Sequence, residues 1–156
     1  MSYDLMVFDP QVPPSDREAF LSWYEEQAKW SEGHTYNDPA VTTPALRAWF
    51  MDMIQKYPAI NGPFKTDDVD SDQISDYCIG RSVIYIGFAW SLAESAYDDV
   101  FLLAEKHRVG FFDVSANDAG VWMPQSDGRL VCVHVDAGPR PTEPLSQKKK
   151  WWEFWK

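Results

Sequence analysis

The sequence predicts an α+β domain with three helices and a mixed or antiparallel sheet. Two short apolar runs rich in β-branched and aromatic residues, 83–88 and 111–114, flank a segment with apolar positions at helical spacing, 91–108. A strand, a helix and a strand in this order usually lie parallel in one sheet. Two further helical patterns precede them, so we expect helices mainly on one face. One arrangement that satisfies this order is a ferredoxin-like core with an added C-terminal meander.

The first predicted strand covers residues 3–8 (YDLMVF). Its apolar side chains point to both faces, which is typical of a strand near the centre of a sheet. Ser15 and Glu18 then match a capping box, in which each side chain accepts from the backbone NH of the other residue. We therefore expect the first helix to start there and to run to about Trp30.

A second helix is predicted after the Gly-, Asn- and Pro-rich loop 31–41. Thr43 is a suitable N-cap, because Pro44 follows it at the first helical position. The apolar stripe of this helix extends to about Tyr57. Residues 58–75 carry turn residues and acidic side chains, so we expect a surface loop with almost nothing that could pack.

The third helix is predicted from a second capping box, formed by Ser91 and Glu94. Before it, residues 74–79 are expected to turn back through Gly80 as an antiparallel hairpin onto 83–88.

Two more short strands, 121–123 and 130–135, follow turn signals. We expect a single domain over 1–136, followed over 137–156 by a proline-rich spacer and a basic aromatic tail.

Composition excludes some classes of function. The chain has 24 acidic and 14 basic residues and a net charge of −10, which disfavours nucleic acid as a partner and favours a basic protein. Eight tryptophans are more than a core of this size requires, so some are expected to be exposed as contact residues. No secretory leader or membrane span is apparent in the sequence, and we expect a cytoplasmic protein with Cys78 and Cys132 as buried thiols.

Motifs for catalysis, cofactors and metals are missing from the sequence. There is no GxSxG elbow, no GxGxxG or GxxxxGK[ST] loop, and no histidine or cysteine pair at zinc-ligand spacing. Asp68, Asp70 and Asp72 have the spacing that opens a calcium loop. Gln73 and Ile79, however, stand where that loop needs glycine and glutamate. We therefore expect no enzyme activity, no cofactor and no metal.

Two segments are candidates for binding a partner. The first is the acidic loop, with Asp67, Asp68, Asp70 and Asp72, which would attract a basic protein. The second is the tail KKKWWEFWK, with Trp151, Trp152 and Trp155. The tail could dock on the acidic body, bind a partner or lie at a membrane surface, and membrane contact is the weaker alternative because so short a peptide binds bilayers poorly.

A pocket is also predicted at the carboxyl ends of the strands. If 83–88 and 111–114 are parallel neighbours, then Trp90, Ser91, Asp113 and Ser115 meet beside a helix N-terminus. A small anion or polar ligand would fit there. The alternative is that Ser91 only caps its helix and Asp113 only ends a strand.

Most of the chain, up to about Pro124, resembles a group of small, mostly uncharacterised bacterial proteins. The resemblance lies in the opening SYDLMVFDP, in WYEEQAKWSE and TTPALRAWFMDM, and in the core segment VIYIGFAWSLAESAYDDVFLLAEKHRVGFFDVS. Some members look like immunity proteins of polymorphic toxins delivered by type VI secretion or contact-dependent systems. The resemblance implies a non-enzymatic protein that binds and neutralises a cognate toxin in the cytoplasm. The alternative from the residues alone is a small ligand-binding or enzymatic domain that uses the strand-end pocket.

Overall fold

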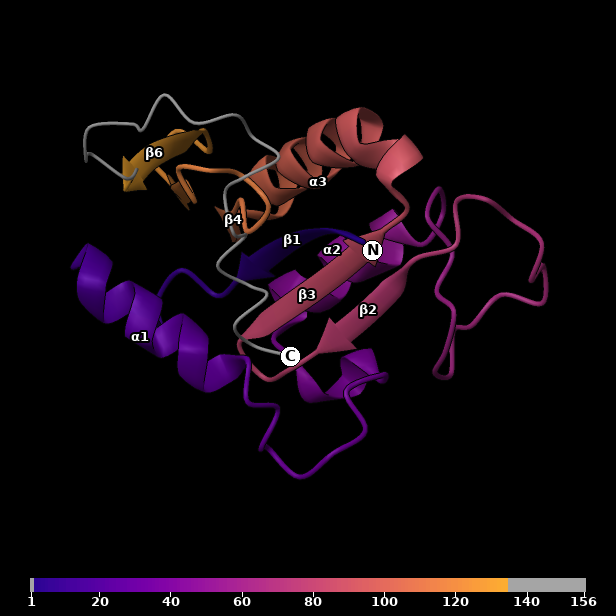
Figure 1. Ribbon diagram of the computed structural model, residues 1–156. Helices are drawn as coiled ribbons and strands as arrows, with labels where there is room; N and C mark the ends of the chain where they lie inside the picture. The colour runs from indigo at the N-terminus through magenta and orange to yellow at the C-terminus, as the bar shows by residue number, and fades with distance from the viewer. Residues whose placement is uncertain (1, 135–156) are drawn as a thin grey trace.

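The computed structural model describes residues 2–134. Over this range the chain forms a six-stranded antiparallel sheet and three α-helices, which confirms the predicted α+β class (Figure 1). The elements in chain order are β1 (Tyr3–Phe8), α1 (Arg17–Gln27), α2 (Pro44–Met53), β2 (Asp76–Ile79), β3 (Val83–Phe88), α3 (Ala93–His107), β4 (Gly110–Phe112), β5 (Val121–Pro124) and β6 (Leu130–His134). Short 3-10 turns cover Pro39–Val41 and Trp90–Leu92.

The strands follow the order β2-β3-β1-β4-β5-β6, and every neighbouring pair is antiparallel. β3 and β4 therefore run parallel to each other, as expected for strands joined by a crossover helix. They are not neighbours, because β1 lies between them and pairs with both. This corrects the expectation of adjacent strands. β1 can take the central place because its residues from Asp4 to Phe8 are all buried.

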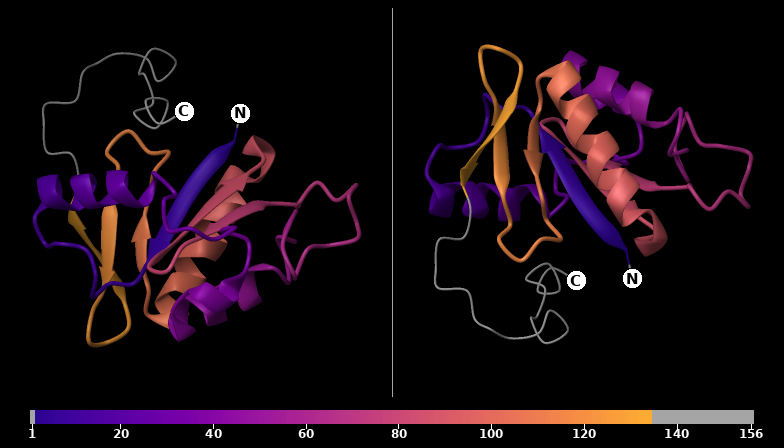
Figure 2. Two further views of the ribbon diagram at one scale, coloured as in Figure 1. Left: turned by 90° about the horizontal axis from the view of Figure 1, so that it is seen from below. Right: turned by 90° about the horizontal axis from the view of Figure 1, so that it is seen from above.

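The helices cover both faces of the sheet, two on one side and one on the other (Figure 2). Leu5 and Val7 of β1 belong to the core shared with α2 and α3, whereas Met6 and Phe8 pack with Phe20 of α1. The alternation follows from the period of two in a strand. Each fully buried large apolar side chain contributes about 1.5–3 kcal/mol to the stability of the folded state. Because the side chains of β1 are buried on both faces, this strand stabilises both layers.

The first helix starts one residue later than the predicted capping box. Asp16, not Ser15, is the N-cap of α1, and its Oδ2 accepts from the backbone NH of Ala19 at 3.0 Å. The Asp16 side chain makes the capping bond to the third helical residue, as the serine was expected to do, but one position later and to the Ala19 NH in place of the Glu18 NH. The predicted start of α2 is confirmed, because Thr43 is its N-cap and accepts from the Leu46 NH at 3.3 Å.

The predicted capping box of the third helix does not form. The 3-10 turn Trp90–Leu92 precedes α3, whose N-cap is Leu92 and makes no side-chain capping bond. The Leu92 NH donates instead to the carbonyl of Ala89, so the first turn is closed by the backbone. The side chain of Ser91 is exposed.

Two helices end earlier than their apolar patterns indicate. α1 ends at Gln27, and Trp30 has a left-handed backbone with φ of 51°, which cannot continue a helix. α2 ends at Met53 although Tyr57 is buried. Pro58 disfavours the helical conformation at the residue before it, and Tyr57 reaches the core from a turn.

The predicted hairpin between β2 and β3 is confirmed, with the Gly80 NH donating to the Val83 carbonyl at 2.8 Å. Residues 58–75 contain no helix or strand and extend beyond the sheet (Figure 1). Part of this segment packs, against expectation, because Ala59 is buried and forms bridges with Lys65 and Ser75.

The two cysteines are free, and each is partly rather than fully buried. Cys78 lies on β2 and Cys132 on β6, the two edge strands of the described sheet. Burial raises the pKa of the Cys78 thiol to about 11. Across residues 2–134, no helix combines the length and the apolar character needed to cross a bilayer.

The packing at the centre predicts one sensitive glycine. A Cβ on Gly110 would lie 2.3 Å from the ring carbons of Phe8, so Gly110→Ala should lower the free energy of unfolding by about 1–3 kcal/mol through overpacking. Gly87→Ala is the matched control, since its Cβ would come no nearer than 3.3 Å to any atom and meets the Asp4 carboxylate there. Urea unfolding of both variants measures the free energy of unfolding. Equal losses of stability in the two variants would contradict the close contact between Gly110 and the Phe8 ring.

Candidate functional site

The sheet register brings several acidic segments to one end of the molecule. Tyr3 pairs with Phe88, and Gly87 pairs with Asp76, so β1 and β2 begin where β3 ends. β4 ends on the same side, because Phe112 pairs with Met6. The acidic loop before β2, the turn into α3 and the turn after β4 therefore lie at one end (Figure 2). We call this the acidic end; its carboxylates are Asp67, Asp68, Asp70, Asp72, Glu94, Asp98 and Asp113.

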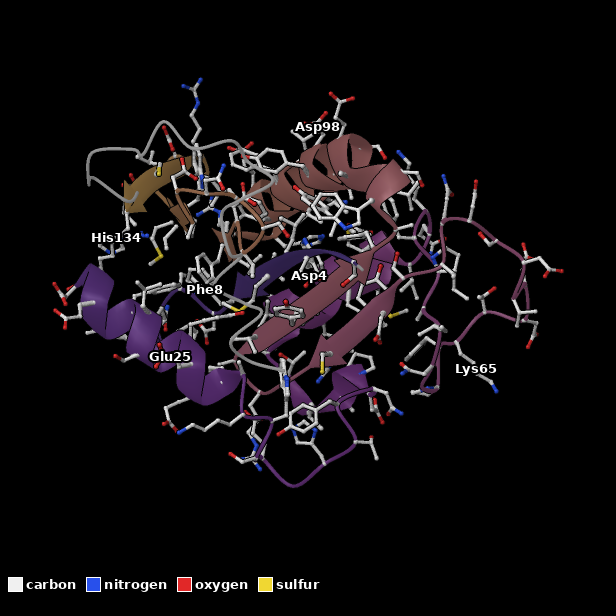
Figure 3. All side chains as sticks on the ribbon, in the orientation of Figure 1. Asp4, Phe8, Glu25, Lys65, Asp98 and His134 are labelled. Carbon is white, nitrogen blue, oxygen red and sulfur yellow. The ribbon has the colours of Figure 1, made fainter. Side chains whose placement is uncertain are left out.

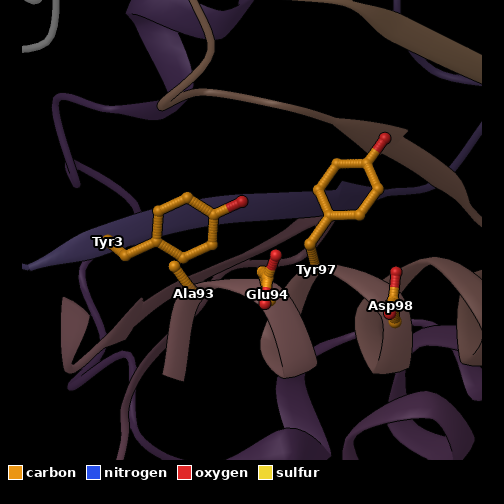
Figure 4. A pocket seen from close by; sticks show the side chains of 5 residues that line it. All are labelled: Tyr3, Ala93, Glu94, Tyr97 and Asp98. Carbon is orange, nitrogen blue, oxygen red and sulfur yellow. The ribbon is translucent and has the colours of Figure 1, made fainter. Parts of the chain in front are cut away.

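A pocket of about 470 Å³ opens at this end, between the start of β1 and the first turns of α3. It is lined by Tyr3, Ala93, Glu94, Tyr97 and Asp98, and we call it the tyrosine pocket. In Figure 4 both tyrosine rings stand on the same side of the α3 ribbon. Asp98 points outward from α3 (Figure 3). The four α3 residues share one helix face because residues four apart are neighbours on a helix.

The electrostatic potential in the tyrosine pocket is negative. Burial raises the pKa of Tyr3 well above its ordinary value, and the charge of Asp113 adds to the effect. Burial, followed by Asp113 and Asp118, also raises the pKa of Tyr97. Both side chains thus remain neutral phenols at physiological pH, with a hydroxyl available to donate.

Asp113 is the group that the fold leaves least satisfied. Burial raises its pKa to about 6, the charge of Asp118 adds to the shift, and a hydrogen bond from the Ala116 backbone opposes it. Its Oδ1 is buried and has no hydrogen-bond partner within residues 2–134. The buried Asp4 contrasts with it, because Asp4 accepts from Ser2 and Tyr85 at 2.6 and 2.8 Å.

Other carboxylates of α2 and α3 have cationic partners. Asp99 accepts from Lys56 and from the Tyr57 hydroxyl, both at 2.7 Å. Asp52 pairs with Lys106 at 2.9 Å and with His107 at 2.6 Å. These pairs border a smaller cavity of about 260 Å³ between the two helices. By contrast, within the described chain no ion pair engages Glu94, Asp98 or Asp113. The tyrosine pocket thus combines aromatic rings with carboxylates that have no cation there.

The predicted strand-end residues have different surroundings. Trp90 is 41% exposed, and its ring lies 5.3 Å from that of Tyr3, so it flanks the tyrosine pocket from outside. Asp113 acts on the pocket through its charge. Ser115 is engaged elsewhere: its Oγ accepts from the Asp4 NH and donates to the Asp4 carbonyl, both at 2.9 Å.

Sequence reasoning missed the residues that line the pocket. Tyr3, Glu94, Tyr97 and Asp98 were not among the predicted site residues, because the pocket was expected between adjacent strands β3 and β4, whereas β1 lies between them. One usable signal was the spacing of Glu94 and Asp98, which puts two carboxylates on one helix face.

The acidic loop forms a second part of the acidic end. Asp67, Asp68, Asp70 and Asp72 are all exposed. The same segment also exposes large apolar side chains, namely Ile60, Phe64 and Val69, the last at 75%. The loop is attached to the core through Phe64, whose ring lies 6.1 Å from that of Phe50. The other predicted contact residues, Trp151, Trp152 and Trp155, lie outside the described residues.

Over residues 2–134, no group of three His, Cys, Asp or Glu side chains is placed to hold a metal ion. No family model, curated protein or solved structure matches the chain. The resemblance to immunity proteins stays a prediction.

The environment of Asp113 predicts a pH-dependent stability. Below about pH 4 the Asp113 carboxyl is protonated in the folded and in the unfolded protein. Above about pH 6 it is charged in both, and the charge is buried in the folded protein but solvated in the unfolded one. Wild-type stability should therefore fall over this range. Asp113→Asn should stabilise the protein by about 1–3 kcal/mol at pH 7 and by little at pH 4.

Urea unfolding of the two proteins at both pH values measures this difference. Asp98→Asn is the control, since this exposed carboxylate on the same pocket should give a much smaller change. A variant that gains no stability at pH 7 would show that the folded state tolerates the Asp113 charge.

Proposed function

We propose that this chain is a non-catalytic binding protein that neutralises a basic protein in the cytoplasm, as an immunity protein neutralises its cognate toxin. The observation that supports this most is that one surface segment, residues 58–75, exposes the carboxylates of Asp67, Asp68, Asp70 and Asp72 together with the apolar side chains of Ile60, Phe64 and Val69. Apolar contact residues within a charged surround are the usual composition of a protein interface. The resemblance to immunity proteins supports the same function.

The charge distribution supports a basic partner. The chain has 24 acidic and 14 basic side chains, and residues 137–156 contain two of the acidic and five of the basic ones. Residues 1–136 therefore hold 22 acidic and nine basic side chains. A body with this imbalance attracts a positively charged domain over distances near the Debye length and raises its association rate. Nucleic-acid-cleaving toxins are one class of protein with such a basic surface, because they must bind phosphates.

A second candidate function is the binding of a small organic cation in the tyrosine pocket. Its volume, about 470 Å³, falls within the range of ligand pockets in proteins. Tyrosine faces and carboxylates together bind ammonium and guanidinium groups well. This function is of a different class, since it would require no protein partner.

The first candidate predicts an effect of charge reversal in the loop. Asp68→Lys/Asp70→Lys should slow association with the product of the neighbouring reading frame about tenfold or more at low salt, because steering is lost. The same double variant should protect less well against the toxicity of that product. Surface plasmon resonance at several salt concentrations measures the rate.

Glu18→Lys/Glu26→Lys on α1 is the matched control, with an equal charge change on exposed side chains away from the loop. An unchanged rate and salt dependence in the loop variant would rule out the loop as the contact surface. A neighbouring product that is harmless alone and does not bind would argue against immunity altogether.

The second candidate predicts a ligand effect. Spermidine or arginine should raise the melting temperature of the full chain, because a ligand that binds only the folded state stabilises it. The gain should be lost in Glu94→Gln/Asp98→Asn. Differential scanning calorimetry measures it, and an equal gain in wild type and variant would indicate nonspecific screening of the acidic body.

A further inference from the structure

We propose that the tyrosine pocket binds the chain's own basic aromatic segment, residues 148–156 (KKKWWEFWK). The contact would lie within one molecule and cover part of the acidic end, and a basic partner would have to displace it. This inference needs no toxin partner and stands apart from the proposed function.

The pocket has the chemistry to bind such a segment. Glu94 and Asp98 line it, and neither carboxylate meets a cation anywhere in residues 2–134. The charge of Asp113 acts on Tyr3 of the pocket, and its buried Oδ1 has no hydrogen-bond partner within residues 2–134. The rings of Tyr3 and Tyr97 offer aromatic faces to a lysine ammonium or to another ring.

The segment supplies the complement. Within nine residues it carries four lysines, three tryptophans and a phenylalanine, and its single acidic residue is Glu153. The neighbouring Lys148, Lys149 and Lys150 match the two lining carboxylates in charge. Trp151 and Trp152 follow directly, so a bound lysine would bring an indole ring to the tyrosines.

The chain leaves the described fold at the same end of the sheet as the pocket. His134 pairs with Val121, Val121 with Phe112, and Phe112 with Met6, so β6 ends on the same side as the start of β1 (Figure 2). Three strand spacings separate β6 from β1, which is about 15 Å. Thirteen residues, 135–147, connect His134 to Lys148, and a chain of this length reaches up to about 45 Å.

Connection within one chain also favours the contact energetically. A ligand joined by a linker of this length acts at an effective concentration near the millimolar range, so contacts too weak to bind a separate peptide suffice. The acidic loop competes as a docking site through its carboxylates and exposed Ile60, Phe64 and Val69, but it offers one aromatic ring and no pair of tyrosines beside its carboxylates. The pocket is therefore the better match for a segment that is both basic and aromatic.

Zero-length cross-linking of the full chain tests the proposal. A water-soluble carbodiimide joins a lysine amine to a carboxylate that it contacts, and mass spectrometry of the monomer identifies the pair. We expect Lys148, Lys149 or Lys150 joined to Glu94 or Asp98. Most of this product should be lost in Glu94→Gln/Asp98→Asn and retained in Asp67→Asn/Asp68→Asn, which removes the same charge from the acidic loop.

Three results would overturn the proposal: products spread evenly over the acidic loop, products found only in covalent dimers, or none from these lysines. A second measurement is independent of the cross-linking chemistry. Reversing Lys148, Lys149 and Lys150 to glutamate in the full chain should shift the amide resonances of Tyr3 and of residues 93–98. Unchanged resonances at these positions would show that the segment does not occupy the pocket.

Discussion

Burial of β1 on all sides is the constraint on which the rest of the structure depends. This strand pairs with β3 along one edge and with β4 along the other, while Leu5 and Val7 face α2 and α3 and Phe8 faces α1. The side chains of one hexapeptide thus belong to both cores. The close approach of the Phe8 ring to Gly110 belongs to the same constraint, since β4 can pair with β1 only where no side chain intervenes.

The central position of β1 also determines the surface chemistry. Both β3 and β4 run antiparallel to β1. The turns that follow β3 and β4 therefore lie beside the start of β1. The turn after β4 carries Asp113 and Asp118, and the first part of α3 carries Glu94 and Asp98. The charges of Asp113 and Asp98 act on Tyr3, the first residue of β1. Asp99 pairs with Lys56 from the turn after α2, whereas within residues 2–134 no ion pair engages the adjacent Asp98 or Glu94, about one turn earlier. The end of the sheet is therefore acidic because of strand direction as much as composition.

The sequence was sufficient for the elements and insufficient for their arrangement. Alternating and helical periodicity located β1, β3 and α2, because such patterns depend only on which faces are buried. Periodicity could not decide which strand lies between β3 and β4, since this depends on contacts between residues far apart in the sequence, such as the pairing of Met6 with Phe112. The capping box at Ser91 failed for a local reason, a competing 3-10 turn. The pocket was missed because its tyrosines come from two elements.

The separation of the two cysteines restricts how oxidation could affect this protein. Five strand spacings lie between β2 and β6, about 24 Å, whereas a disulfide requires Cα atoms within about 7 Å. Cys78 and Cys132 therefore cannot bridge within one folded molecule. Any disulfide that they form would join two molecules through their edge strands. Oxidation would therefore link folded molecules into polymers and would not stabilise a single molecule with an intramolecular disulfide.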